Sequence, residues 1–371
     1  DRGRHRLAYA LRNEHATGAS YPAGAEPRVE DLAGEAGPLA EYCCALNVMV
    51  RRVTTLSGIP ALSYTISSDS IAVHHVDPIT GVPNEWTCTP AQMSALMKAE
   101  APKLSTMLAV AASGAAVSSA MGRLGQGSTN SLLAFANVRL GVWLPHPRWA
   151  GQAGKEKTPY PRVRMSYLLK EVFGLFDWDD LHVYITDGAH WEGTAIVELF
   201  RNDDIDEAIA FDAGGAGGDS LVSPGEVVTL SSLELFDDVD IDVEPLRAEP
   251  DGTRGGGLAD RVATVGLVRG VGSQGEPTIG VLWYCRNVLA KDSSARLKSY
   301  GERFETFPSV STINQFFDDE KFQSYRVLGY EAGTAIVEAR NELAATMTGV
   351  DDLAGFRELD PEHWAVAVLQ E

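Results

Sequence analysis

The chain of 371 residues has few cysteines, no long apolar run and a shortage of basic residues. Four cysteines in this length are too few for a scaffold held together by disulfides. There is no stretch of about 18 strongly apolar residues, so we expect no transmembrane helix. The 31 basic residues face 51 acidic ones, and the resulting net charge of −20 argues against a nucleic-acid partner.

The charge is spread unevenly along the chain. Residues 1–160 hold 14 basic and 12 acidic residues, whereas residues 161–371 hold 17 and 39. The acidic part is either a solvated face or a docking surface, because net charge bears on solubility and association before it bears on fold. Residues 1–40 are rich in Ala, Gly, Pro and Glu, contain no secretory signal core, and are expected to form a linker or flexible arm.

Local patterns in the first half predict both strands and helices. Apolar and β-branched runs predict strands at 43–50, 63–67 and 71–76. Thr89 followed by proline predicts the start of a helix, with Thr89 as its N-cap. Residues 104–122 carry no charge and many small side chains, which is typical of a helix buried on all sides.

A change of pattern follows in the second half. Residues 181–186 form a compact apolar run, 191–200 have a helical pattern and 207–212 resemble a further strand. Strand, tight turn, helix and strand in this order predict a βαβ unit and a parallel sheet. The spacing G-x-G-x-x-G at 270–275 is interpreted as a hairpin turn, because a strand and not a helix follows it.

Asp187 is the residue most suggestive of chemistry. It stands at the end of the predicted strand and is followed by Gly188 and Ala189, which permit a sharp turn. Such an aspartate can act as the base that takes the proton of a serine nucleophile. It can equally be a cap that accepts backbone N–H groups of the next helix. The residues by themselves leave both interpretations open.

Five segments in the same order resemble the bacterial membrane-associated patatin-like phospholipases. Residues 186–192, TDGAHWE, are similar to the segment TDGGHxEN of that family. The other similar segments are EYCCALNV at 41–48, ASGAAVS at 112–118 followed by Met121 and Gly122, NVRLGVWLP at 137–145, and FPSVSTINQFFDDEKFQSYRVLG at 307–329. The resemblance spans residues 40–330.

The resemblance implies an α/β fold of the patatin type, a three-layer α/β/α sandwich with a mostly parallel sheet. It implies a linker at 1–40, the patatin-like domain at 41–330 and a helical extension at 331–371. It also implies a Ser–Asp dyad that hydrolyses acyl esters of lipids, with Asp187 as the dyad aspartate. Gly188, Ala189, His190 and Glu192 would shape the loop around it.

The nucleophile of the family does not carry over, because no G-x-S-x-G occurs in this chain. We therefore expect the domain to be incomplete on its N-terminal side, with the serine supplied by an upstream segment or a partner chain. An internal substitute is Ser113, whose neighbours are small like those of a nucleophile elbow, although no clear strand precedes it. The family's E-N-L-G-L becomes EGTAI at 192–196, and residues 203–260 match poorly.

Two functions follow as hypotheses. The first is part of a lipid acyl hydrolase, and the alternative is a degenerate, non-catalytic subunit that acts through a protein or a membrane surface. The expected partners are an acyl-ester lipid, a membrane surface and the chain that carries the nucleophile, without nucleic acid. No cofactor or metal site is expected, since C-x-x-C, H-E-x-x-H and a Walker loop are all missing. The resemblance implies a soluble segment in the bacterial cytoplasm or on the cytoplasmic side of the membrane.

Overall fold

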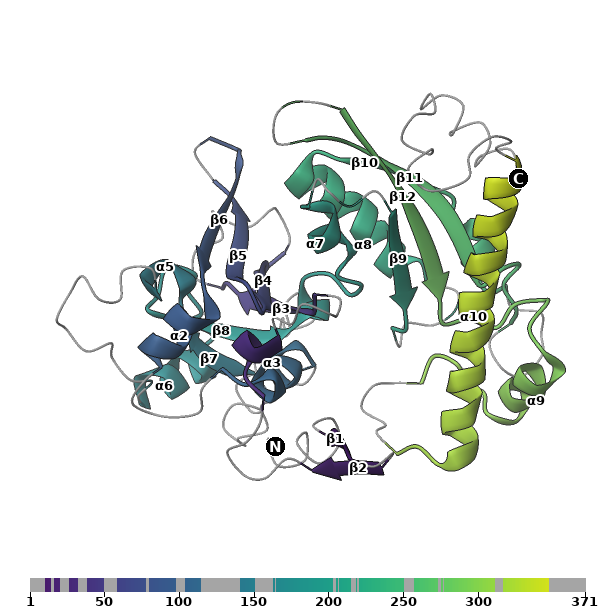
Figure 1. The fold of residues 1–371 in the computed structure, drawn as a ribbon, viewed down its shortest axis with the longest axis horizontal. Helices are drawn as coiled ribbons and strands as arrows, with labels where there is room; N and C mark the ends of the chain where they lie inside the picture. Colours follow the sequence, from purple (N-terminus) through teal and green to yellow (C-terminus); the bar gives the residue numbers. More distant parts are fainter. Residues whose placement is uncertain are drawn as a thin grey trace. The chain divides into compact units, whose positions relative to one another are not determined.

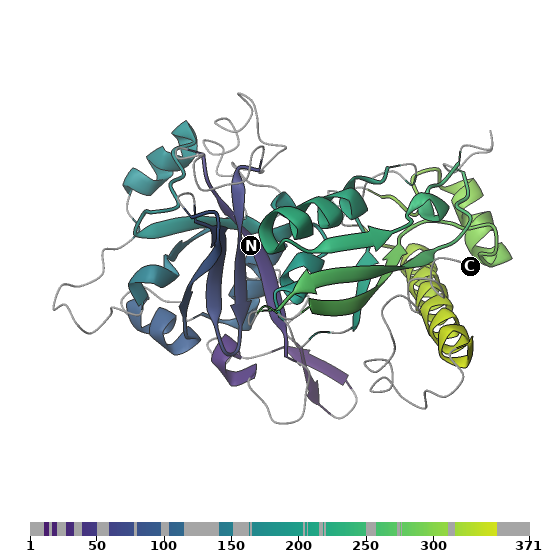
Figure 2. The same cartoon turned by 90° about the horizontal axis from the view of Figure 1, so that it is seen from above.

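The computed structural model describes the greater part of the chain. The described residues are 11–14, 17–20, 27–32, 39–49, 59–77, 80–97, 104–114, 141–150, 163, 165–202, 205, 207–214, 218, 220–249, 257–272, 275, 277–310 and 316–346. The chain divides into two compact units, Asp1–Trp191 and Glu192–Glu371. Each unit contains its own principal sheet (Figures 1 and 2).

The first unit is built on a six-stranded sheet whose neighbouring strands are all antiparallel. Its spatial order is β6-β5-β4-β3-β8-β7. The strands are β3 (Glu41–Asn47), β4 (Ala61–Ser67), β5 (Ile71–Val76), β6 (Pro83–Cys88), β7 (Val142–Pro145) and β8 (His182–Asp187). A separate hairpin pairs β1 (Leu11–Glu14) with β2 (Thr17–Ser20).

Short helices accompany this sheet. They are η1 (Val29–Leu32), α2 (Pro90–Leu96), α3 (Thr106–Ser113), α5 (Pro147–Ala150), α6 (Met165–Phe173) and η4 (Gly188–His190). All seven residues of β4 are buried, so both faces of the sheet are covered at its centre. The core includes Leu46, Tyr64, Ile66 and Ile71, which are fully buried. Burial of such side chains is the main favourable term that holds the unit together.

The second unit is built on a four-stranded mixed sheet of order β10-β11-β12-β9. Only the pair of β9 and β12 is parallel among its three strand pairs. The strands are β9 (Glu207–Asp212), β10 (Asp238–Ile241), β11 (Ala263–Val271) and β12 (Pro277–Arg286). The helices are α7 (Ile196–Phe200), α8 (Val222–Leu230), the π-helical turn η5 (Ser231–Leu235), η6 (Glu244–Leu246), α9 (Ala295–Arg303) and the long α10 (Asp319–Thr346).

Several local predictions are confirmed. The strand predicted at 71–76 is β5, and the one predicted at 63–67 lies within β4. Thr89 caps α2 through a capping box, in which it accepts the N–H of Gln92 while the Gln92 side chain accepts the N–H of Thr89. The G-x-G-x-x-G spacing lies at the turn of the β11–β12 hairpin, where Val271 pairs with Pro277.

The predicted βαβ unit is wrong. The strand ending at Asp187 belongs to the six-stranded sheet, whereas the strand at 207–212 belongs to the four-stranded sheet. Strand β8 pairs antiparallel with β3 and β7. Strand β9 pairs parallel with β12, which lies more than sixty residues further along the chain. Strand pairing is a long-range choice that the order of elements does not determine.

The α/β class is confirmed, but the mostly parallel sheet is not. Within the described residues, eight of the nine strand pairs are antiparallel. Of the buried helix predicted at 104–122, α3 covers Thr106–Ser113 and ends at Gly114. Residues 115–140, which include Met121 and two of the family-like segments in part, lie outside the described residues.

Candidate functional site

Asp187 ends strand β8 and begins the tight turn η4. Its Cα lies opposite that of Cys44 in the pairing of β8 with β3. One carboxylate oxygen, Oδ1, accepts the backbone N–H of Ala189 at 2.9 Å, so Asp187 caps the turn as one of the two sequence interpretations predicted. Within the described part of the chain, the other oxygen has no hydrogen-bond partner. The cap therefore leaves half of the carboxylate available for other chemistry.

The surroundings of Asp187 favour its protonated form. Burial raises the pKa of the carboxyl above the ordinary aspartate value, and the hydrogen bond from the Ala189 N–H and the charge of a protonated His190 partly oppose that shift. No lysine or arginine among the described residues forms an ion pair with it. A carboxylate with a raised pKa is a stronger base than one in water, which is a property of acid–base residues in enzymes.

Gly188 is required by the packing of the turn on strand β3. A Cβ added to Gly188 would lie 2.7 Å from the carbonyl oxygen of Cys43 and 3.1 Å from its carbonyl carbon. Both are backbone atoms, so no flexible side chain could move aside. Ala189 follows as the donor of the capping N–H and is exposed. Gly188 thus allows the turn, and with it Asp187, to approach β3 closely.

His190 closes the turn and is tied to two strands. Its ring nitrogen Nδ1 lies 2.8 Å from the hydroxyl oxygen of Thr186 on β8. The same hydroxyl oxygen accepts the side-chain amide of Asn47 on β3 at 2.8 Å. All three residues are buried. Thr186 and Asn47 lie in two of the family-like segments, but no motif or spacing in the sequence marks them as site residues.

Glu192 follows the turn η4 and organises the segment after it. It is the first residue of the second unit, where its oxygen Oε1 accepts both the N–H of Thr194 at 2.5 Å and the Thr194 hydroxyl at 2.7 Å. Burial raises the pKa of this carboxyl, and the two Thr194 donors oppose the shift. These contacts make Glu192 an organiser of the segment that leads into α7.

Ser113 is the last residue of α3 and lies next to the same backbone carbonyl as Gly188. Its hydroxyl donates to the Cys43 carbonyl oxygen at 2.7 Å. The serine ends a helix, whereas a nucleophile elbow places it at a strand-to-helix turn. The neighbouring Cys44 is fully buried, and burial raises the pKa of its thiol, which keeps it in the unreactive protonated form.

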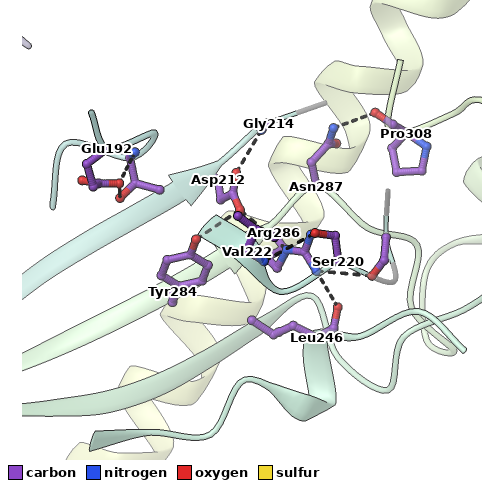
Figure 3. Close-up of polar contacts among 12 residues, drawn as sticks. Glu192, Asp212, Gly214, Ser220, Val222, Leu246, Tyr284, Arg286, Asn287 and Pro308 are labelled. Atoms are coloured by element: carbon purple, nitrogen blue, oxygen red, sulfur yellow. Dashed lines mark hydrogen bonds and ion pairs between the residues drawn. The ribbon is translucent and has the colours of Figure 1, made fainter. Parts of the chain in front are cut away.

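A second polar cluster, not anticipated from the sequence, is buried in the second unit (Figure 3). Asp212 and Arg286 end the parallel strands β9 and β12 as register partners, with Arg286 Nε 3.6 Å from Asp212 Oδ2. Tyr284 donates its hydroxyl to the same carboxylate at 3.1 Å, and the Gly214 N–H donates to the other oxygen at 3.0 Å. Arg286 also donates to the carbonyl oxygens of Gly218 and Leu246.

This cluster is satisfied internally and is best explained as structural. The carboxylate has a cation, a hydroxyl and a backbone N–H as partners, which is the compensation that a buried charge needs. A signal for it was present in the sequence, because Asp212 ends a strand-like run and precedes glycines, as Asp187 does. Its partner Arg286 is far away in the sequence, and only the parallel pairing brings the two together.

Comparison of the chain with protein-family models, curated proteins and solved structures finds no significant match. Among the described helices, none combines the length and the apolar character needed to cross a bilayer. The described residues also contain no group of three or more His, Cys, Asp or Glu side chains arranged to hold a metal ion.

The close approach at Gly188 generates a first prediction. Gly188→Ala is expected to lower the free energy of unfolding by about 1–3 kcal/mol, because the new methyl group overlaps backbone atoms of β3. Gly193→Ala is the matched control, since a Cβ there meets no atom within 4 Å. Urea unfolding of both variants measures the difference. An equal loss in the two would contradict the importance of this contact.

The raised pKa of Asp187 generates a second prediction. Between the ordinary aspartate pKa of about 4 and the raised value, the folded state binds more protons than the unfolded one, so stability falls as pH rises. Asp187→Asn removes this penalty and retains an oxygen for the Ala189 N–H. We expect the variant to melt at a higher temperature than the wild type at about pH 7, with the gain vanishing at about pH 4.

The control for this measurement is Asp242→Asn. Asp242 makes the same local contact, accepting the N–H of Glu244 at 3.1 Å, but in an exposed turn. It is expected to melt like the wild type at both pH values. A lower melting temperature for Asp187→Asn at about pH 7 would contradict a charge that is costly to bury.

Proposed function

We propose that this chain is part of a patatin-like lipid acyl hydrolase, in which Asp187 is the base of a Ser–Asp dyad. The observation that carries the proposal is the state of Asp187: a carboxylate at a strand end that accepts one N–H, has a raised pKa and keeps one oxygen without a hydrogen-bond partner among the described residues. The five ordered segments supply the family and the substrate class. The patatin-like three-layer sandwich is part of the same proposal.

The chemistry requires a serine from an upstream segment or a partner chain. Asp187 takes the proton of the serine hydroxyl as the serine oxygen attacks the ester carbonyl. The tetrahedral intermediate then expels the alcohol, which receives the proton, and leaves an acyl-serine. Water, deprotonated by Asp187, attacks this second ester. The serine oxygen leaves, takes the proton back from Asp187, and the fatty acid is released. The proposed partners are accordingly an acyl-ester lipid and the membrane surface that presents it.

A non-catalytic role is the second candidate, and one contact favours it. The serine near Asp187 in the described residues, Ser113, donates its proton to a backbone carbonyl and lies at the end of a helix. The changed segment after His190, in which Glu192 bonds Thr194, also departs from the family pattern. A protein that retained the turn but lost the reaction would act through its surfaces.

The two candidates differ in their response to Asp187→Asn. In the hydrolase, loss of the base is expected to lower ester hydrolysis by about 10²–10⁴-fold. Hydrolysis of a fluorogenic acyl ester and of phospholipid vesicles is measured on the protein as produced from its own gene, together with any chain that copurifies. Asp242→Asn, which changes a carboxylate of the same local geometry, is expected to leave the rate unchanged.

A serine-directed fluorophosphonate locates the nucleophile in the same samples. The probe is expected to label a serine of an upstream segment or partner, and labelling is expected to survive Ser113→Ala. Loss of labelling in that variant would instead identify Ser113 as the nucleophile. If the probe labels no chain and Asp187→Asn hydrolyses the esters at the wild-type rate, the hydrolase proposal is overturned in favour of the non-catalytic subunit.

A further inference from the structure

A buried chain of hydrogen bonds connects strand β3 to the turn that carries Asp187. It runs from the side-chain amide of Asn47 through the hydroxyl of Thr186 to Nδ1 of His190, with both distances 2.8 Å. Asn47 is 2% exposed, Thr186 is fully buried and His190 is 7% exposed. Water has little access to this chain, so the hydrogen bonds within it determine which group donates and which accepts, while the Oδ1 atom of Asn47 is buried without a partner among the described residues.

The direction of the first hydrogen bond follows from the surroundings of Asn47. Its nitrogen Nδ2 also lies 3.4 Å from the carbonyl oxygen of Tyr184 and 3.5 Å from that of Ala45. Carbonyl oxygens only accept, so the amide must direct its N–H groups to this side. The hydroxyl oxygen of Thr186 is therefore an acceptor toward Asn47.

The direction of the second hydrogen bond follows from the single proton of Thr186. Among the described residues, Nδ1 of His190 is the one acceptor within reach of this hydroxyl. If Nδ1 carried a proton and donated to Thr186, the threonine proton would be buried without an acceptor. That loss disfavours the Nδ1–H form by about tenfold or more. Thr186 therefore donates, and Nδ1 accepts.

We infer that Asn47 and Thr186 hold His190 as a neutral imidazole with its proton on Nε2. The same donor–acceptor direction disfavours the imidazolium, because its Nδ1–H would face the hydroxyl proton of Thr186. His190 is then a positioning residue, which ties η4 to β3 and β8 and leaves Asp187 to act as the base. The tautomer stands on the hydrogen bonds alone, whereas the division of roles between His190 and Asp187 rests on the proposed function.

The tautomer can be read directly from the ring nitrogens by ¹⁵N NMR of the folded protein. In the wild type, Nδ1 is expected to show the signal of an unprotonated acceptor and Nε2 that of an N–H. A proton on Nδ1 would overturn the inference without any variant. Among the described residues, titratable groups next to this turn include Asp187 and Cys44, whose thiol remains protonated, so the spectrum is followed as Asp187 titrates.

Two substitutions test the direction of the hydrogen bonds in the relay, the chain that joins Asn47, Thr186 and His190. Asn47→Asp replaces the donor by an acceptor, so Thr186 should donate to the new carboxylate and accept from His190. We expect the proton to move to Nδ1, a change of at least tenfold in tautomer ratio, with a higher pKa of the imidazole. Thr186→Val removes the relay and is expected to raise the imidazole pKa, whereas Thr186→Ser restores the wild-type spectrum. An unchanged spectrum in both Asn47→Asp and Thr186→Val would overturn the inference.

The role of His190 is separated from the proposed reaction by the pH profile of ester hydrolysis. In Thr186→Val, the pKa of His190 measured by NMR should shift, while the midpoint of the rate profile stays with Asp187. A midpoint that follows His190 would make the histidine the base and overturn its positioning role. A protein with the expected tautomer but no hydrolysis would contradict the proposed function and leave the relay intact.

Discussion

The antiparallel pairing of β3 with β8 is the constraint on which the candidate site depends. It brings Cys44 opposite Asp187 and leaves the Cys43 carbonyl at the position where the turn η4 must pass. Only a residue without a Cβ fits at Gly188, and the hydroxyl at the end of α3 bonds the same carbonyl. A strand, a turn and a helix thus share one backbone group, so a displacement of any one would disturb Asp187.

Two aspartates at strand ends make the same local hydrogen bond in different surroundings. Asp187 and Asp212 each accept the N–H of the residue two positions later, at 2.9 and 3.0 Å. Asp212 also has Arg286 and Tyr284 as partners, which compensate its charge on burial. Asp187 forms no ion pair with a lysine or arginine among the described residues, and burial raises its pKa, although a protonated His190 would oppose that shift. The charged form of Asp187 is therefore less favoured than that of a carboxylate in water, which is the property that motivates the proposed role of this residue.

Two buried polar residues connect the turn of Asp187 to the sheet. Asn47 and Thr186 are buried donors and acceptors inside an apolar core, where an unsatisfied group is costly. Their placement is reasonable if they orient His190 and hold the turn in one geometry. Residues of this kind are hard to find from one sequence, because a threonine and an asparagine within strands have no distinctive spacing.

The sequence by itself determined the local features of this protein. Thr89 followed by proline specified a capped helix start, the β-branched run at 71–76 specified a strand, and Asp187 with Gly188 specified a turn at a strand end. Such features depend on a few neighbouring residues and on backbone sterics, which a single chain displays directly. The resemblance to patatin-like segments drew attention to Asp187, and the capping bond it makes was one of the two predicted interpretations.

Only the tertiary structure decided which strands pair and which side chains meet. It separated β8 from β9 into different sheets, joined Asp212 to Arg286 and brought Asn47 to Thr186 and His190. Two of these contacts, Asp212 with Arg286 and Asn47 with Thr186, join residues more than seventy positions apart, and their stability comes from burial shared by whole elements. The sequence therefore identified the carboxylate, while the fold determined its partners, its exposure and its tendency to hold a proton.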